Sequence, residues 1–259
     1  MIGFLYSWVL GDHPNNTIFS YNWHNVRHIN RFFADAARAL PEKKLVFADI
    51  GGGRSPYFDH FLSRQAAFHV VDLADSLPRE ERRPIVQHPG FAENIPLTDE
   101  FADVVLCNQV LEHVVDPEQS VREMHRILRH GGWIIGSVPH VSPIHLEPYD
   151  FRRYTRYGLK QILVKAGFED VRVEGSGGVF SAAALMVCMD VMLSRLREGS
   201  PQSFLGRRAL VLSPIVGLIN AAAWVLDRIL GDKGRTPANL CWTARKRTIG
   251  EVPVVPSSN

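Results

Sequence analysis

Cysteine is scarce in this chain of 259 residues, which contains three, Cys107, Cys188 and Cys241. An odd number at wide intervals fits neither a disulfide framework nor a zinc site, so we expect no metal and a reducing compartment, the cytoplasm. An excess of one charge is also lacking, because 29 Lys and Arg face 27 Asp and Glu and leave a net charge of +2. Without a strong global field, nucleic acid is not an expected partner.

A basic leader is absent as well. The apolar residues 1–10 have no Lys or Arg ahead of them and no small-residue cleavage site after them, so we expect a short helix or strand packed on the domain rather than a secretory signal. What the chain has in quantity is apolar residues, 46% of the total. That proportion is enough for the core of one large α/β domain.

Short apolar runs and amphipathic segments alternate through the first two thirds of the chain. Strands are expected at 45–50, 68–71, 84–87, 104–107, 133–138 and 169–174, and helices at 22–40, 117–129 and 155–166. Asp116 and Thr155 are expected N-caps, and Gly131 and Gly167 are expected to end their helices. Strands that alternate with helices predict a parallel, doubly wound sheet.

Two motifs at the ends of the first two strands point to a nucleotide ligand. Asp49 and Ile50 lead into the cluster Gly51–Gly53, where glycine lets the backbone turn sharply and approach a ligand without a Cβ in the way. Asp72 ends the second strand, at the position from which a carboxylate reaches the ribose hydroxyls in nucleotide-binding sheets. Dinucleotide enzymes use the same device, so these motifs alone leave the ligand class open.

Four further motifs follow in order: AENIPL at 92–97, FADVV at 101–105, VLEHV at 110–114 and ILRHGG at 127–132. With them, the region from about Leu45 to Glu174 resembles the class I S-adenosylmethionine-dependent methyltransferases of type 11, the branch that includes ubiquinone and menaquinone biosynthesis enzymes. The resemblance implies a seven-stranded Rossmann-like sheet of order 3-2-1-4-5-7-6. It also implies S-adenosylmethionine as the cofactor.

The resemblance further implies where the cofactor lies. From its methionine end through the ribose and adenine, and then at the sulfonium, the expected contacts are Asp49, Gly51, Gly52, Gly53, Asp72, Leu73, Ala92, Glu93, Asn94, Asn108 and Gln109. One position departs from the family pattern, because Phe91 stands where an acidic residue is common. Adenine recognition is therefore expected to rest on Glu93 or on backbone groups.

A polar loop follows the fifth strand, where substrates of open α/β sheets bind. Its candidates for a catalytic base are His140, His145 and Asp150, and His113 of the VLEHV motif is a fourth. The segment resembles the His/Asp-Phe-x-Arg-Tyr-Thr stretch of methyltransferases associated with sugar or cell-surface glycan pathways. In the alternative interpretation, Asp150 pairs with the loop arginines and His113 is a structural residue that begins the next helix.

About 60 residues separate the sixth strand from a last strand at 239–244, where the family usually has a hairpin. This insertion holds two long apolar segments, 178–196 and 209–230, and residues 191–235 carry seven Lys or Arg against three Asp or Glu. Three hypotheses stay open: a helical lid or dimer interface, a helix pair on a membrane surface through Arg195, Arg197, Arg207 and Arg208, and a transmembrane hairpin, which Asp190 disfavours.

The expected organisation is an N-terminal helical segment at 1–44, a methyltransferase core at 45–175, an apolar helical insertion at 176–236, a final core strand at 237–247 and a disordered tail at 248–259. The expected function is methyl transfer to a small-molecule, sugar or lipid-linked acceptor, with a hydroxyl as the favoured acceptor group. Carbon methylation of a quinone-like lipid is one alternative, and a non-catalytic cofactor-binding protein is another. A peripheral membrane contact and a homodimer through the insertion are the expected partners beyond the substrate.

Overall fold

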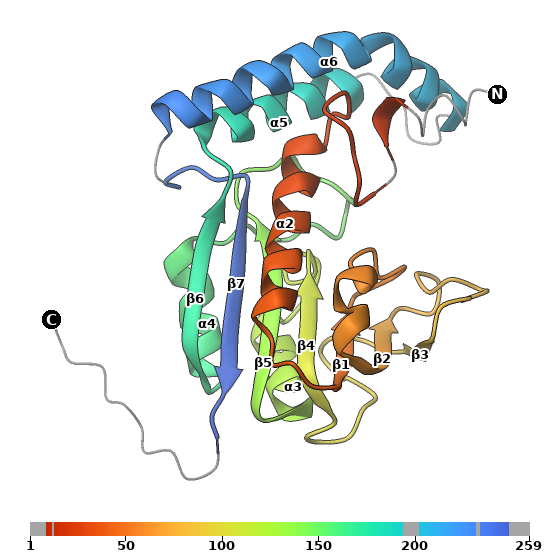
Figure 1. Ribbon diagram of the computed structural model, residues 1–259, viewed down its shortest axis with the longest axis vertical. Helices are drawn as coiled ribbons and strands as arrows, with labels where there is room; N and C mark the ends of the chain where they lie inside the picture. Colours follow the sequence, from red (N-terminus) through yellow and green to blue (C-terminus); the bar gives the residue numbers. More distant parts are fainter. Residues whose placement is uncertain (1–8, 12, 194–201, 232–233, 249–259) are drawn as a thin grey trace, which may run out of the picture.

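A computed structural model describes residues 9–11, 13–193, 202–231 and 234–248 (Figure 1). Residues 1–8 and the tail from 249 onward, for which we predicted a packed apolar segment and disorder, lie outside the described residues. The elements follow in the order α2 (Trp23–Ala39), β1 (Leu45–Ile50), η1 (Phe58–Arg64), β2 (Gln65–Asp72), β3 (Ile85–Pro89), β4 (Ala102–Asn108), α3 (Pro117–Ile127), β5 (Leu128–Pro139), α4 (Arg156–Lys165), β6 (Phe168–Ser176), α5 (Val179–Leu193), α6 (Gln202–Leu230) and β7 (Asn239–Lys246).

The sheet has seven strands in the order β3-β2-β1-β4-β5-β7-β6, which confirms the predicted fold class. The first five strands of the chain run parallel, and β7 pairs antiparallel with both β5 and β6. Ile50 pairs with Cys107, and Asn108 with Ser137, so the parallel strands end at one edge of the sheet. The side chains that follow these strands therefore meet at that edge.

The core lies on both faces of the sheet because side chains alternate along each buried strand. Phe47 of β1 packs with Phe33 of α2 on one face, in an aromatic cluster that includes Phe61 and Phe68. The other face packs against α3 and α4 through Met124, Ile127, Leu159 and Leu163. This packing fixes the ends of the strands, where the site lies.

One predicted helix end was wrong. We expected the helix after the fourth strand to run to Arg129 and end at Gly131, but α3 ends at Ile127 and β5 begins at once with Leu128. Leu128 pairs with Ala102 of β4, and Gly131 lies inside the strand with φ +73°. Strand pairing thus replaces the last helical turn. The predicted caps are present, because Asp116 accepts the N–H of Gln119 at 2.9 Å and Thr155 accepts that of Gly158 at 3.1 Å.

The insertion forms two packed helices, α5 and α6, across the end of the sheet where β6 ends and β7 begins (Figure 1). Asp227 of α6 holds the start of α5, because its carboxylate accepts the N–H groups of Gly178, Phe180 and Ser181 at 3.2, 3.0 and 2.9 Å. The segment Leu210–Leu230 is long and apolar enough to cross a membrane, and 28% of it is buried in the structure. The side chains of Arg195, Arg197, Arg207 and Arg208 lie outside the described residues.

Candidate functional site

The glycine loop after β1 is shaped around a buried carboxylate. Gly51 and Gly53 have φ of +68° and +50°, which only glycine adopts without strain. Asp49 lies beneath the loop and accepts the hydroxyl of Ser55 at 2.7 Å, and burial raises the pKa of its carboxyl to about 7. A Cβ on Gly52 would lie 2.4 Å from Asp49 Oδ2, so this glycine makes room for the protein's own carboxylate.

At Gly51 we also expected glycine to make room for a ligand. Here the structure differs, because a Cβ would lie 2.4 Å from the side chain of Val110. At Gly53 the nearest atoms to an added Cβ are Asp72 Oδ2 at 3.6 Å and Ser76 O at 3.9 Å. An added Cβ at Gly53 would therefore make only ordinary van der Waals contacts, so the positive φ is what favours glycine there.

Asp72 connects the loop to the end of β2. Its carboxylate accepts the N–H of Gly53 at 2.8 Å and the N–H of Leu73 at 2.7 Å, and partial burial raises its pKa. These bonds orient the carboxylate and leave it acceptor sites, since each oxygen has two lone pairs. Asp72 is thus fixed at the rim of the space beside the loop.

One cavity of about 610 Å³ joins this rim to the loop after β5. A volume of this size accommodates a nucleoside-sized ligand. Its walls include some of the predicted cofactor residues and part of the predicted acceptor loop, but not His140, His145 or Asp150. The lining residues are Gly51, Val71, Asp72, Leu73, Ser76, Gly90, Phe91, Ala92, Glu93, Gln109, Val110, His113, Val114, Val115, Leu146, Glu147, Tyr149 and Phe151.

A second, small pocket lies beneath the glycine loop and is lined by Asp49, Gly51, Gly52, Tyr57 and Asn108, among others. The hydroxyl of Tyr57 is buried there and has no hydrogen-bond partner among the described residues. Asn108 accepts the hydroxyl of Ser137 at 2.6 Å, which holds its amide at the end of β4. The pocket therefore presents polar groups beside the larger cavity.

The predicted adenine contacts divide into two groups. Ala92 and Glu93 line the cavity, whereas Asn94 is not among the lining residues. The carboxylate of Glu93 accepts the N–H of Val115 at 3.0 Å, so it braces the turn before α3. Phe91, which stands in place of an acidic residue, is 63% exposed and lines the cavity with its ring.

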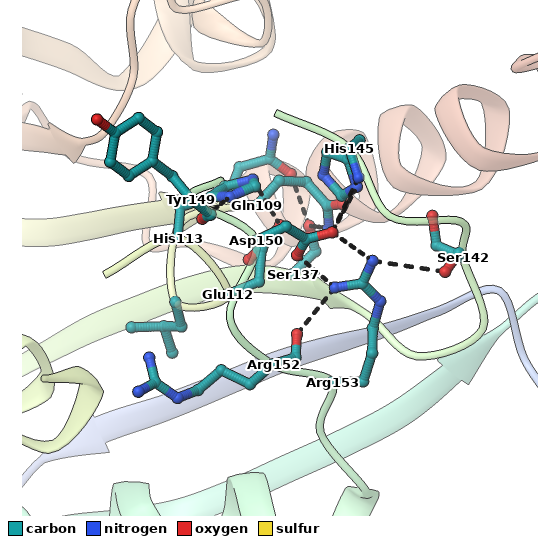
Figure 2. Close-up of polar contacts among 12 residues, drawn as sticks. Gln109, Glu112, His113, Ser137, Ser142, His145, Tyr149, Asp150, Arg152 and Arg153 are labelled. Carbon is teal, nitrogen blue, oxygen red and sulfur yellow. Dashed lines mark hydrogen bonds and ion pairs between the residues drawn. The ribbon is translucent and has the colours of Figure 1, made fainter. Parts of the chain in front are cut away.

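The polar loop after β5 is held by an ion pair (Figure 2). Arg153 donates to both oxygens of Asp150, at 2.5 and 2.7 Å, and its charge lowers the pKa of that carboxyl to about 2. Asp150 also accepts the backbone N–H of His145 at 3.0 Å. Asp150 is therefore a poor base that positions His145, and its pairing with Arg153 is the ion pair of the alternative interpretation.

Of the predicted histidines, the structure brings two together. The rings of His113 and His145 lie 4.9 Å apart, edge to face, and His113 also lines the cavity. His140 is separate from them: its Nδ1 lies 2.7 Å from the carbonyl of Tyr154, and it does not line the cavity. His113 lies in a turn before α3, not at the start of the helix.

Sequence reasoning missed one member of this cluster. Glu112 is fully buried, and burial raises the pKa of its carboxyl to about 8. Its Oε1 lies 3.7 Å from His113 Nε2. The signal was present in the VLEHV motif, where Glu112 is an acidic residue within an apolar run, and buried carboxylates of this kind concentrate at functional sites.

Comparisons with known proteins agree with this geometry. Residues 48–136 match the family described as Methyltransferase domain. A probable S-adenosylmethionine-dependent methyltransferase of Mycolicibacterium smegmatis is 40% identical over 106 residues, which cover 39% of this chain and 40% of that protein. The ubiquinone/menaquinone biosynthesis C-methyltransferase UbiE of Shewanella sp. is 24% identical over 199 residues, 60% of this chain and 77% of that protein.

Solved structures share the fold. A SAM-dependent methyltransferase from Archaeoglobus fulgidus superposes with a TM-score of 0.54 at 17% identity, over 94% of this chain and 99% of that one. At this identity the likeness concerns the fold alone. The match to the M. smegmatis relative spans 40% of that protein's length, so what the relative does as a whole is not transferred to this chain.

Proposed function

The chain belongs to the type-11 family of class I S-adenosylmethionine-dependent methyltransferases, and from this premise we propose that it methylates a hydroxyl of a small-molecule, sugar or lipid-linked acceptor. The observation that carries the proposal is one cavity whose lining includes Gly51 of the glycine loop, Asp72 and His113. A cofactor site and a proton acceptor on one cavity are what methyl transfer to a hydroxyl requires.

The residues fit S-adenosylmethionine. Asp72 offers a fixed carboxylate to the ribose hydroxyls. The carboxyl of Asp49 and the hydroxyl of Tyr57, which has no hydrogen-bond partner among the described residues, are polar groups that suit the charged methionine end. When bound, the cofactor supplies an activated methyl group on its sulfonium, so the protein's main tasks are positioning and the exclusion of water.

The chain's own residues act on the acceptor. As the acceptor oxygen bonds to the methyl carbon, the carbon–sulfur bond breaks and the hydroxyl proton must leave. The Nδ1 of His113 lies 2.8 Å from the carbonyl of Tyr149, so Nδ1 carries the ring proton. The lone pair of Nε2 is therefore free to accept the hydroxyl proton. Asp150 and Arg153 hold His145 beside it.

The cavity wall also suits an acceptor with an apolar part. Leu146, Tyr149 and Phe151 of the loop are 70%, 65% and 46% exposed and line the acceptor end. Exposed apolar side chains that converge on a cavity mark ligand-binding surfaces. A lipid-linked or aromatic acceptor would cover them.

Carbon methylation of a quinone-like lipid is the second candidate. The same apolar wall favours it, and UbiE of Shewanella sp., which is similar over 60% of this chain, is described as a C-methyltransferase. The two candidates differ in the atom that receives the methyl group. We propose the cytoplasm as the compartment, because Cys107, Cys188 and Cys241 are buried free thiols.

The experiment is a labelled transfer assay. The protein is incubated with S-adenosylmethionine that carries a deuterated methyl group and with a library of sugars, lipid-linked saccharides and quinone-like lipids, and products are identified by mass spectrometry. We expect the label on an oxygen of one acceptor class, whereas label on a ring carbon would favour the second candidate. His113→Asn should lower turnover while cofactor affinity stays near wild type.

His130→Gln is the matched control, because His130 pairs with Glu100 at the opposite end of the sheet. Full turnover of His113→Asn on the true acceptor would place the proton acceptor elsewhere. Absence of label in every class, with the cofactor bound, would contradict the proposed activity and favour a cofactor-binding protein without catalysis.

A further inference from the structure

We propose that Glu112, His113 and His145 form a binding site for one divalent first-row metal cation at the acceptor end of the cavity. The inference rests on the proposed function in one respect, because the cation would hold the acceptor hydroxyl. The site itself is argued from the arrangement of its ligands. One ligand atom of each residue lies within 4.8 Å of the others (Figure 2).

The buried carboxylate of Glu112 is the first observation. Its exposure is 0%, and neither Oε1 nor Oε2 has a hydrogen-bond partner in another described residue. A buried carboxyl group without a partner is costly, and buried charges are normally paired or bound to metal. The backbone carbonyl of Glu112 accepts the N–H of Phe151 at 2.9 Å, so a backbone hydrogen bond joins the acceptor loop to the turn that carries this carboxylate.

The two histidines present free nitrogens. His113 Nδ1 lies 2.8 Å from the carbonyl of Tyr149, and His145 Nδ1 lies 3.2 Å from the carbonyl of Pro143 and 3.3 Å from Asp150 Oδ2. A carbonyl or carboxylate only accepts, so both Nδ1 atoms carry the proton. Both Nε2 atoms therefore keep a lone pair, which is the form of imidazole that binds a metal.

These outer contacts match those of metal-bound histidines, whose second ring nitrogen donates to a carboxylate or a backbone carbonyl. Asp150 is itself held by two hydrogen bonds from Arg153. Asp150 orients His145, and Arg153 in turn orients Asp150. His113 Nε2 lies 3.7 Å from Glu112 Oε1. Two ligands of a tetrahedral zinc, with bonds of about 2.0–2.1 Å, lie roughly 3.3 Å apart. The three ligand atoms, which lie within 4.8 Å of one another, would therefore approach by up to about 1.5 Å when a metal ion binds.

The ligand set selects the class of cation. Two imidazoles and one carboxylate suit Zn²⁺, Mn²⁺, Fe²⁺ or Co²⁺, whereas Mg²⁺ and Ca²⁺ prefer oxygen ligands throughout. Three protein ligands leave coordination positions open, as in catalytic zinc sites. Because His113 also lines the cavity, an acceptor hydroxyl there could take an open position. His113 Nε2 would then be a metal ligand instead of the proton acceptor, and the cation would lower the pKa of the hydroxyl so that its proton passes to water at neutral pH.

Simple packing does not account for the arrangement. A protonated Glu112 needs an acceptor for its proton, but neither of its oxygens has a hydrogen-bond partner among the described residues, and His113 Nε2 lies 3.7 Å from Oε1, beyond hydrogen-bond distance. Arg153, the neighbouring cation, donates to Asp150 and to backbone carbonyls instead. A metal ion satisfies the carboxylate and both lone pairs together.

The test measures metal binding without activity. Full-length protein, stripped with chelator and saturated with S-adenosylhomocysteine, is titrated with Zn²⁺ and Mn²⁺ by calorimetry and with Co²⁺ by visible absorption. We expect one site per chain with a dissociation constant below about 10 μM for Zn²⁺. Glu112→Gln and His145→Asn should each weaken binding at least tenfold, and each should alter the Co²⁺ spectrum.

His130→Gln, far from the cluster, should bind like wild type. If Glu112→Gln fails to fold, His145→Asn decides, because His145 is partly exposed and its ring packs at the edge of the loop. No binding by wild type, or binding that both variants retain, would overturn the proposal. Stoichiometric binding that depends on the cluster would support it even if no acceptor is ever methylated, so its failure and that of the proposed function are distinguishable.

Discussion

Asp72 holds the glycine loop and faces the cavity at once. Asp72→Ala removes both the bond to Gly53 and the acceptor for the ribose hydroxyls. We expect cofactor affinity to fall at least tenfold, which is about 1.4 kcal/mol, when measured by calorimetry with S-adenosylhomocysteine. Asp75→Ala, three residues on and exposed, is the control. Wild-type affinity in a folded Asp72→Ala protein would remove Asp72 from the site.

Asp49 predicts a pH dependence of stability in the cofactor-free protein. Its folded-state pKa is raised to about 7, so the folded protein keeps a proton that the unfolded chain, with a pKa of about 3.9, has released. Stability therefore falls as pH rises through this window. Between about pH 4 and pH 8, the free energy of unfolding of wild type should fall by on the order of a few kcal/mol relative to that of Asp49→Asn. Denaturant unfolding of both proteins at each pH measures this difference. A difference that stays constant with pH would contradict the assignment.

At the scale of elements, the insertion depends on one side chain. Asp227 of α6 accepts three backbone N–H groups at the start of α5, and sequence reasoning did not find it because its partners lie 46 to 49 residues away. Asp227→Ala leaves those donors unsatisfied and should lower the free energy of unfolding by about 1–3 kcal/mol. Asp190→Ala, on the exposed side of α5, should change it by less than about 0.5 kcal/mol.

The outer face of α6 is the second element with a testable role. Val211, Ile215, Leu218 and Ile229 are 76%, 55%, 73% and 70% exposed, so the helix does not close over the sheet as a lid on this face. We propose that this apolar face contacts a partner, either a second copy of the chain or a membrane surface. Leu218→Asp should keep the wild-type melting temperature. If the partner is a second copy, the variant should lose self-association in analytical ultracentrifugation, and if the partner is a membrane, it should lose flotation with anionic liposomes.

Leu62→Asp is the control for this face, because Leu62 is 48% exposed on η1. A wild-type protein that is monomeric and never floats would contradict both partners. Loss of flotation at high salt as well as in Leu218→Asp would favour the membrane surface, since attraction to anionic lipid is screened by salt.

At the scale of the whole molecule, local patterns predicted the fold well. The run 45–50, the end of the second strand at Asp72 and the caps Asp116 and Thr155 depend on nearby residues, and all appear in the structure. The start of β5 was missed because Leu128 is a strand residue only through its pairing with Ala102. Strand pairing is a long-range contact that periodicity does not contain.

The site divides in the same way. The glycine loop and Asp72 could be predicted as cofactor contacts because that prediction follows from their position after a strand. The cluster of Glu112, His113 and His145 was not, because it joins a turn before α3 to a loop 32 residues later, and because Glu112 gains its significance only from complete burial. The sequence therefore could not predict which of the candidate histidines lie together. In the structure His140 lies apart from His113 and His145.

The central claim is that cofactor and acceptor share the cavity between Asp72 and His113. A crystal structure with S-adenosylmethionine bound tests it most directly. We predict the ribose hydroxyls on Asp72, the methionine end over Gly51–Gly53 beside Asp49, and the sulfonium methyl directed toward His113. A cofactor whose ribose lies away from Asp72, or whose methyl group faces away from the loop at 140–154, would contradict the account.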